Sequence, residues 1–342
     1  MSMSALRLSV VVITKNQAWN IGRLLTSVIE ETRSLPAVEI ILVDSASTDA
    51  TVQEAQAYPI TILRLHAGQH MNAAAGRYIG ARHATGDLVL FLDGDMELYS
   101  GWLKLALELL ERNATIGAIT GGLIDRPIDT RERGLRGIHA DDDRFFDVQF
   151  GGGATLYRRA VLDQVGSFNP FLFSDEEPDL CLRIRHAGFR VVQTFWPIAY
   201  HYSHPPGRYG TIYRRWRRKL FLGAGQNLRY YRGTDLFWPY VRERGYGLLP
   251  GAAFLIGLLL LGFSMITRRW QWFGIWTLGA ASVVGLDALR KRSLYRSLAS
   301  VLERIFILDG TVRGFLMAPR APSSYNPRFD VVQAYVVERT RE

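Results

Sequence analysis

The stretch that decides the fold is Leu88-Val89-Leu90-Phe91-Leu92, followed directly by Asp93-Gly94-Asp95. The apolar run predicts a strand buried on both faces of a parallel sheet. In such sheets ligands bind beyond the carboxyl ends of the strands, where these two aspartates fall. Their carboxylates suit Mg²⁺ or Mn²⁺. A simple turn is the alternative, because Asp and Gly both favour turns for local reasons.

A second acidic strand end strengthens the ligand interpretation. The run Ile40-Ile41-Leu42-Val43 ends at Asp44, and Ser45, Ser47 and Asp49 follow it. Because parallel strands end at one edge of a sheet, Asp44 and the Asp93-Gly94-Asp95 tripeptide are expected to converge. A metal and a phosphate-bearing ligand can be held at such an edge.

The pattern around these strands is that of an α/β domain over residues 1–235. Apolar runs predict strands at 6–14, 38–43, 60–65, 87–92 and 189–195. Helical spacing predicts helices at 20–32, 50–57, 73–84 and 175–186. Uniformly apolar strands favour a mostly parallel sheet with helices on both faces.

Composition limits the class of protein. The chain has 342 residues, 48% of them hydrophobic and 21% charged, which excludes a disordered or fibrous chain. The formal charge of +9 suits nucleic acid, anionic lipid or a phosphate-rich substrate. The single cysteine, Cys181, excludes an intrachain disulfide, so the fold does not depend on an oxidising compartment.

Two apolar segments follow the α/β domain. Residues 247–266 carry no charge and are long enough to span a bilayer, and residues 270–289 are mostly apolar. We expect a transmembrane hairpin in a membrane region 236–292, followed by an amphipathic segment and tail at 293–342. Flanking arginines favour both ends on the cytoplasmic side, although Arg268 and Arg269 oppose this. The expected location is therefore the inner membrane, multi-pass, with a cytoplasmic catalytic domain; a pair of buried helices is the alternative.

Four stretches together resemble family 2 of the inverting glycosyltransferases, which have the GT-A fold. They are Val11-Val12-Ile13-Thr14-Lys15-Asn16, Val43-Asp44-Ser45-Ala46-Ser47-Thr48-Asp49, Ala84-Thr85-Gly86-Asp87 leading into Phe91-Leu92-Asp93-Gly94-Asp95, and Asp175-Glu176-Glu177-Pro178-Asp179-Leu180-Cys181-Leu182-Arg183. Their order and spacing agree with the family over residues 6 to about 205.

The resemblance implies a nucleotide-sugar donor and assigns residues to it. Thr14 and Asn16 would line the base pocket, Asp44 would hold the base or ribose, and Asp93 would contact the ribose or the metal. Arg77 lies where the family often has Ala-Arg-Asn, although Tyr78 replaces the asparagine here. A surface arginine of a helix is the ordinary alternative for Arg77.

The resemblance also implies a divalent metal, Mg²⁺ or Mn²⁺, that neutralises the departing diphosphate. Asp93 and Asp95 would be its ligands, with Asp95 the firmer one. His201 and His204 lie where related enzymes often place a metal or diphosphate ligand. A structural role in a loop is the alternative for both histidines.

The pair Glu176-Glu177 matches the family's Glu-Asp position, whose second carboxylate removes the acceptor's proton. The resemblance thus implies that Glu177 is the general base, one methylene longer than the family's aspartate. Asp175 and Glu176 compete for this role. The alternative is that these acidic residues only stabilise a helix N-terminus, where Pro178 also fits.

A basic run precedes the first apolar segment and contains Arg214, Arg215, Trp216, Arg217 and Arg218. Its position favours lipid headgroups or a lipid-diphosphate acceptor over a phosphate-bearing soluble substrate. Nucleic acid is not expected as a partner, because no recognition module accompanies the run. The run is loosely similar to the Gln-x-x-Arg-Trp motif of processive family members, but the glutamine is missing.

The sequence therefore predicts an inverting, metal-dependent glycosyltransferase of glycan or polysaccharide assembly. Its acceptor is expected to be a hydroxyl of a lipid-linked saccharide at the cytoplasmic membrane face. Transfer onto polyprenyl phosphate is one alternative, and a catalytically silent, transferase-like membrane scaffold is another. A soluble nucleotidyltransferase shares the acidic sheet edge but predicts no membrane association. The sugar, the nucleotide and the oligomeric state stay open.

Overall fold

The computed structural model describes residues 7–128, 143–203 and 208–335. The chain forms two compact units, one of residues 1–205 with 320–342 and the other of residues 206–319. The first unit therefore ends before the predicted domain boundary at 235, and the tail belongs to it. The predicted functional limits at 235 and 292 stay predictions.

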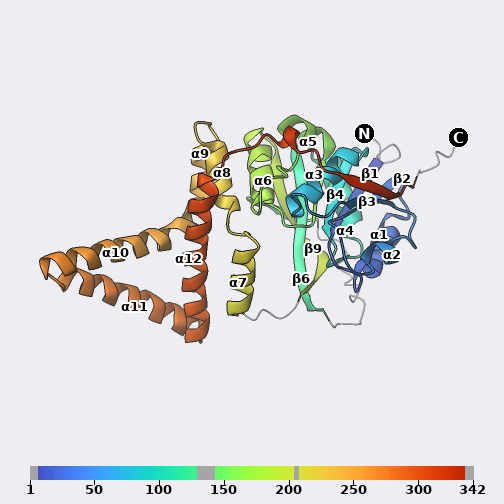
Figure 1. Ribbon diagram of the computed structural model, residues 1–342. Coiled ribbons are helices and arrows are strands. Elements are labelled where there is room, and N and C mark those ends of the chain that lie inside the picture. The colour runs from blue at the N-terminus through green and yellow to red at the C-terminus, as the bar shows by residue number, and fades with distance from the viewer. Residues whose placement is uncertain (1–6, 129–142, 204–207, 336–342) are drawn as a thin grey trace. The chain divides into compact units, whose positions relative to one another are not determined.

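The first half of unit 1 alternates strands and helices, as predicted up to residue 93; the strand and helix after it were not predicted (Figure 1). Its elements are β1 Arg7–Thr14, α1 Ile21–Thr32, β2 Ala37–Asp44, α2 Thr51–Ala55, β3 Thr61–Leu65, α3 Ala73–His83, β4 Leu88–Asp93, β5 Met96–Leu98 and α4 Trp102–Arg112. Strands β3, β2, β1 and β4 lie side by side in that order and are all parallel. The parallel arrangement is therefore confirmed for this half of the sheet.

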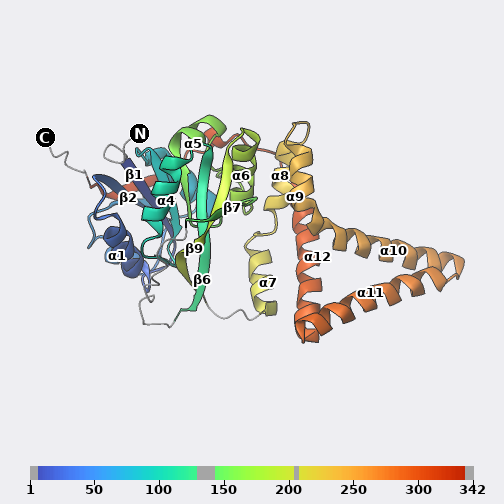
Figure 2. The same cartoon turned by 180° about the vertical axis from the view of Figure 1, so that it is seen from behind.

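The second half of unit 1 is mixed. Its elements are β6 Ile116–Pro127, β7 Phe145–Asp147, β8 Thr155–Arg158, α5 Arg159–Val165, α6 Glu176–His186 and β9 Arg190–Ser203. Strand β8 is antiparallel to both β4 and β6, whereas β6 and β9 are parallel. Figure 2 shows β6 and β9 running side by side. The sheet as a whole is thus mixed: beyond β4 the parallel pair β6 and β9 is joined to the first half through the antiparallel strand β8.

The tail contributes a strand that the sequence did not predict. Residues 322–324 form a short 3-10 helix, and β10 Phe329–Gln333 pairs antiparallel with β3 (Figure 1). The described strands form one ten-stranded sheet with β10 at its edge beside β3. Residues 329–333 are therefore part of the sheet of unit 1.

The core lies on both faces of the sheet, as predicted. Along β1, Leu8, Val10 and Val12 pack in one cluster with α1 and α4, whereas Val11 and Ile13 pack in the other with α3. Burial of such side chains stabilises by roughly 1.5–3 kcal/mol each. Gly80 lets α3 approach β1 closely, because a Cβ there would collide with the side chain of Val11. This close approach brings α3 over the end of β1.

Unit 2 consists of helices. They are α7 Arg208–Arg217, α8 Gly223–Tyr231, α9 Phe237–Arg244, a 3-10 turn at Gly245–Leu248, α10 Leu249–Thr267, α11 Gln271–Lys291 and α12 Leu294–Leu316. Helices α10 and α11 are long and apolar enough to cross a membrane by length and composition, with mean hydropathies of 2.2 and 1.4. They match the two predicted apolar segments and form a hairpin (Figure 1).

The hairpin has few internal contacts. The indole of Trp276 donates to the carbonyl oxygen of Ala253 at 3.0 Å and covers Gly257. Gly251 lies against Leu308 of α12, and Ser297 of α12 donates to the carbonyl oxygen of Val284. Most of the other large apolar side chains of α10 and α11 are exposed, a pattern that suits a lipid environment better than water.

Candidate active site

The two acidic strand ends lie on either side of β1. Ile13 is paired with Asp93 of β4, and Thr14 is paired with Asp44 of β2. The predicted convergence at the sheet edge is therefore present. Beside it lies a cavity of about 260 Å³, lined by Ile13, Thr14, Lys15, Gln17, Ser45, Met71, Asn72, Ala73, Asp93, Gly94 and Asp95. Lys15, Gln17 and Asn72 were not singled out from the sequence.

The Asp93-Gly94-Asp95 tripeptide is a turn held firmly against β1. The amide of Gly94 donates to the carbonyl oxygen of Ile13 at 2.9 Å, and Asn20 Nδ2 donates to the carbonyl oxygens of Gly94 and Met96 at 3.0 and 2.8 Å. Only glycine fits between the aspartates, because a Cβ at Gly94 would lie 2.7 Å from Thr14 Oγ1. The turn therefore presents both carboxylates to the cavity.

A buried arginine joins three carboxylates at this edge. Arg77, on α3, has 2% of its surface exposed, so it is not the surface residue of the ordinary alternative. Its guanidinium lies 2.7 Å from Asp93, 2.7 Å from Glu176 and 3.2 Å from Glu177. Burial by itself lowers the pKa of Arg77, but the carboxylates outweigh it and raise this pKa above its usual value. Arg77 is therefore charged and ties α3, β4 and α6 together.

Carboxyl groups outnumber cations in this cluster. Burial raises the pKa of Asp93 to about 6, against the opposing effect of Arg77. Burial and the neighbouring Glu177 raise the pKa of Glu176 to about 8, again against Arg77. Because one guanidinium cannot neutralise all the carboxylates around it, the site favours a further cation.

The two glutamates at the start of α6 differ in accessibility. The Glu176 side chain is buried and receives a hydrogen bond from Arg77 Nη1. The Glu177 side chain is 17% exposed and lies at the longer distance from the guanidinium. Asp175 precedes the helix with a left-handed backbone, φ +58°. Of the adjacent pair, Glu177 is the more accessible carboxylate.

His201 lies on β9 between two carboxylates from neighbouring strands. Its Nε2 is 3.6 Å from Asp95 Oδ2, and its Nδ1 is 2.8 Å from Asp125 Oδ1 on β6. Asp95 and Asp125 raise the pKa of His201 to about 9, although its burial opposes this. Asp125 was not predicted as a site residue; its register opposite His201 across β6 and β9 brings it there. His204 lies outside the described residues.

The site also fits the divalent ion that the family implies. Asp95 Oδ1 is buried and has no hydrogen-bond partner in the described part of the chain. Two carboxylates and an imidazole are suitable donors for Mn²⁺ or Mg²⁺. Within residues 7–128, 143–203 and 208–335, no three acidic, histidine or cysteine side chains are grouped closely enough to hold an ion by themselves. Mg²⁺ commonly takes phosphate oxygens of a ligand beside one or two carboxylates.

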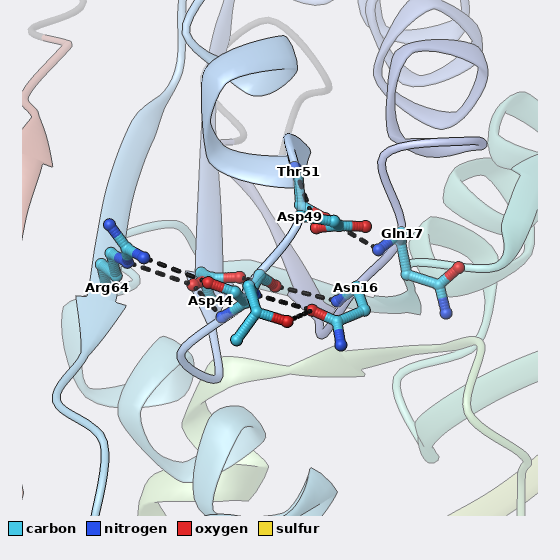
Figure 3. Close-up of polar contacts among 8 residues, drawn as sticks. Asn16, Gln17, Asp44, Asp49, Thr51 and Arg64 are labelled. Carbon is cyan, nitrogen blue, oxygen red and sulfur yellow. Dashed lines mark hydrogen bonds and ion pairs between the residues drawn. The ribbon is translucent and has the colours of Figure 1, made fainter.

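Asp44 and Asn16, which were predicted to bind the nucleotide sugar, belong to a network of hydrogen bonds (Figure 3). The Asp44 carboxylate accepts from the amide of Ser47 at 2.9 Å and from its hydroxyl, and Asn16 Oδ1 accepts from the amide of Thr48 at 2.8 Å. Asp44 is fully buried. Thr14, in contrast, lines the cavity with a buried Oγ1 that has no partner within the described ranges. Contacts of these residues with a nucleotide stay predictions.

The basic run belongs to α7 and the turn after it. Arg214, Arg217 and Arg218 are exposed. Arg215 lies 3.5 Å from Glu303, and the Trp216 indole donates to Asp309 of α12 at 2.8 Å. Trp216 therefore packs inside unit 2, whereas the three arginines extend outward. Their binding of headgroups stays a prediction.

Residues 9–166 match the family model described as glycosyl transferase family 2. The chain contains a family 2 glycosyltransferase domain. Asp44, Arg77, Asp93 and Asp95 lie within the matched residues, whereas Glu177 and His201 lie beyond them. The match confirms the expected family for residues 9–166, and the roles of individual residues stay predictions.

Known proteins support this glycosyltransferase domain and its fold. The chain is 33% identical over 113 residues to an uncharacterized glycosyltransferase of Haemophilus influenzae, covering 33% of this chain and 37% of that protein. It is 24% identical over 232 residues to the glycosyltransferase AglE of Haloferax volcanii, and that match covers 64% of this chain and 72% of that protein. The matches cover only 18–37% of the length of the first curated relatives.

The mannosyltransferase PcManGT from Pyrobaculum calidifontis, solved in complex with GDP-Man and Mn²⁺, has a similar structure. Its TM-score is 0.62 at 21% identity, and the match covers 91% of this chain and 87% of that one. The mixed sheet covered by helices and this likeness confirm the predicted GT-A fold.

Proposed function

We propose that the protein is an inverting glycosyltransferase that uses a nucleotide-sugar donor. The observation that carries this proposal is the convergence on Arg77 of Asp93, from the strand end beside the cavity, and of Glu176 and Glu177, from the start of α6. One buried guanidinium thus ties the donor side of the site to the candidate base. Such preorganisation of charged groups is what acid–base and electrostatic catalysis require.

The donor would occupy the cavity beside the strand ends. Thr14 Oγ1 offers a buried, unpartnered polar atom among the described residues, and Lys15 brings a positive charge to the same wall. Asn16 and Asp44 would shape the loop around the base or ribose through their bonds to Thr48 and Ser47. The similar structure of PcManGT with GDP-Man supports a nucleoside-diphosphate sugar as the ligand class.

Asp93, Asp95 and His201 would hold the divalent ion, Mg²⁺ or Mn²⁺, with Asp95 the firmest ligand. A metal there would neutralise charge on the departing diphosphate. Asp125 would fix the ring of His201 by accepting from its Nδ1, which leaves Nε2 directed toward Asp95. The Mn²⁺ in the PcManGT complex supports this choice of ion.

Glu177 would act as general base. It would take the proton from an acceptor hydroxyl, whose oxygen would bond to the anomeric carbon as the bond from that carbon to the diphosphate oxygen breaks. Arg77 would hold the Glu177 carboxylate in place. Because a single displacement occurs from the face opposite the leaving group, the anomeric configuration inverts.

The acceptor would be a hydroxyl of a lipid-linked saccharide at the cytoplasmic face of the inner membrane, in glycan or polysaccharide assembly. Helices α10 and α11 are long and apolar enough to anchor the enzyme there. The exposed arginines of the basic run, Arg214, Arg217 and Arg218, would meet anionic headgroups or the lipid diphosphate. A freely soluble acceptor would require neither feature.

The test is a panel of nucleotide sugars with the purified full-length protein, with Mn²⁺ or Mg²⁺ and with a chelator. We expect one donor to be bound and slowly hydrolysed, and the metal to be required. Extracted lipid-linked saccharides should accept the sugar, and product analysis will distinguish them from polyprenyl phosphate. No binding and no turnover across all donors would favour the silent scaffold.

A further inference from the structure

The segment that follows α12 lies against the loop that forms one wall of the cavity. We call residues 320–335 the C-terminal segment and residues 66–72, between β3 and α3, the pocket loop. Both belong to unit 1. The pocket loop contributes Met71 and Asn72 to the cavity. The C-terminal segment lines no part of the cavity, so any effect it has on a ligand must pass through the pocket loop.

The start of the pocket loop is joined to the C-terminal segment by backbone and side-chain hydrogen bonds. The amide of His66 donates to the carbonyl oxygen of Arg328 at 3.0 Å. Gln69 Nε2 donates to the same carbonyl at 2.6 Å, and Gln69 Oε1 accepts from the amide of Arg328 at 2.9 Å. His66 also lies 2.9 Å from Asp330. These contacts fix the loop on both sides of Gly68, whose φ is +80°.

Tyr325 holds the next residue of the loop. Its hydroxyl donates to the carbonyl oxygen of His70 at 2.6 Å, and the side chain is only 7% exposed. Its ring contacts those of His70, Tyr78 and Phe171, with centroids 5.5–6.1 Å apart. Burial raises the pKa of Tyr325 to about 12, so the hydroxyl stays a donor. Tyr325 is thus an anchor packed beneath the pocket loop.

The end of the pocket loop transmits this anchoring to the site. Asn72 Oδ1 accepts from the amide of Ala75 and caps α3, which carries Arg77. Asn72 Nδ2 donates to the carbonyl oxygen of Leu172 at 2.6 Å, and the ring of His70 lies 2.9 Å from the carbonyl oxygen of Pro170. The loop is therefore bonded both to the helix of Arg77 and to the segment that leads into α6.

We propose that Tyr325 is a positioning residue for the donor: the C-terminal segment holds the pocket loop in the conformation that binds the nucleotide. The inference rests on the proposed function, because it takes the cavity as the donor site. A loop that is ordered before binding has less conformational entropy to lose, and this raises its affinity. The portion of chain after the apolar hairpin thus holds one wall of the pocket in place without lining it.

The experiment compares three variants of the full-length protein in detergent. Tyr325→Phe removes only the hydroxyl, and Gln69→Ala removes the pairing with Arg328. Gln333→Ala is the matched control, since its side chain donates to the carbonyl oxygens of Tyr58 and Ile60, away from the pocket loop. The probes are UDP and GDP, each with Mn²⁺. The measurements are the dissociation constant, the Tm and hydrogen exchange of residues 66–73.

We expect Tyr325→Phe and Gln69→Ala to weaken binding of the preferred nucleotide by about three- to tenfold, the range expected for the loss of one or two intramolecular hydrogen bonds. Exchange at residues 66–73 should accelerate, donor KM should rise and kcat should stay near that of the wild type. Gln333→Ala should leave the affinity, the exchange of residues 66–73, the donor KM and kcat unchanged, even where it lowers the Tm as much as the two loop variants do.

Wild-type affinity and exchange in both loop variants would overturn the inference. So would an equal loss of affinity in Gln333→Ala, because that would indicate a general loss of stability. If the wild type binds neither nucleotide, the proposed function fails; unchanged exchange at residues 66–73 in Tyr325→Phe would still overturn the positioning role. If Tyr325→Phe does not fold, Gln69→Ala decides by the same measurements.

Discussion

The two acidic strand ends that flank β1 look alike in sequence but differ in structure. At the end of β2, the Asp44 carboxylate is fully buried and accepts two hydrogen bonds from Ser47. Its arginine, Arg64, is 3.8 Å away and 47% exposed. The carboxylate already has protein partners, which hold the loop that follows β2; its contact with the base or ribose stays a prediction.

At the end of β4 the acidic groups are incompletely satisfied. Asp93 shares the buried Arg77 with two glutamates, and Asp95 has a buried oxygen with no partner within the described residues. The comparison teaches that an acidic strand end becomes a candidate for chemistry when its carboxylates lack protein partners. The predictions below test this difference between the β4 end and the β2 end.

The largest effect is expected at Glu177. Glu177→Gln removes the general base and should lower kcat by about 10²–10⁴-fold, while the donor dissociation constant stays the same. Steady-state transfer kinetics and nucleotide binding measure this. Glu176→Gln is the control: it should lower the Tm, because buried Arg77 loses a close partner. Full activity of Glu177→Gln would remove the base assignment.

A smaller loss is expected when Arg77 becomes lysine. A single ammonium cannot hold Asp93, Glu176 and Glu177 in the geometry of a guanidinium. Arg77→Lys should reduce kcat/KM by roughly ten- to a hundredfold and lower the Tm. Arg64→Lys, at the β2 end, provides the matched control and should leave both near wild type. Equal effects of the two substitutions would erase the difference between the strand ends.

Asp125 tests the support of the metal site. Asp125→Asn should weaken Mn²⁺ binding by about tenfold, since a partner that orients a ligating histidine commonly contributes this much. Paramagnetic resonance of Mn²⁺ titrated in the presence of nucleotide measures the affinity without turnover. Unchanged affinity would mean that Asp125 does not orient His201.

The smallest effect on activity is expected at Asp44. Asp44→Asn loses one acceptor for Ser47. An impaired buried hydrogen bond lowers the free energy of unfolding by about 1–3 kcal/mol, so the Tm should fall by a few degrees. Transfer at saturating donor should stay within about threefold of wild type. A loss as large as that at Glu177 would place Asp44 in the chemistry as well.

Much of the parallel half of the fold could be predicted from local patterns. Runs such as Leu88 to Leu92 are buried on both faces, so their apolar character alone indicates a central strand. Strand β10 could not be predicted this way, because it is short and follows a Pro- and Ser-rich tail. Its pairing with β3, far away in sequence, decides that it is a strand.

The candidate site could be predicted only in part for a similar reason. The family's motifs point to Asp93, Asp95 and Glu177, but not to the environment of Arg77, which depends on the close approach of α3 to β1 at Gly80. Asp125 lies opposite His201 through strand register, which local sequence does not indicate. Tyr325 reaches the pocket loop only because the chain returns to unit 1 after α12.

We propose that Asp95 holds a metal, which in turn holds the nucleotide. Binding of the donor's nucleoside diphosphate to wild type and to Asp95→Asn, each with Mn²⁺ and with a chelator, tests it most directly. We predict that wild type binds tightly only with Mn²⁺ and that Asp95→Asn, with an unchanged Tm, binds weakly in both conditions. Binding by Asp95→Asn that still increases with Mn²⁺ as it does in wild type would contradict the claim.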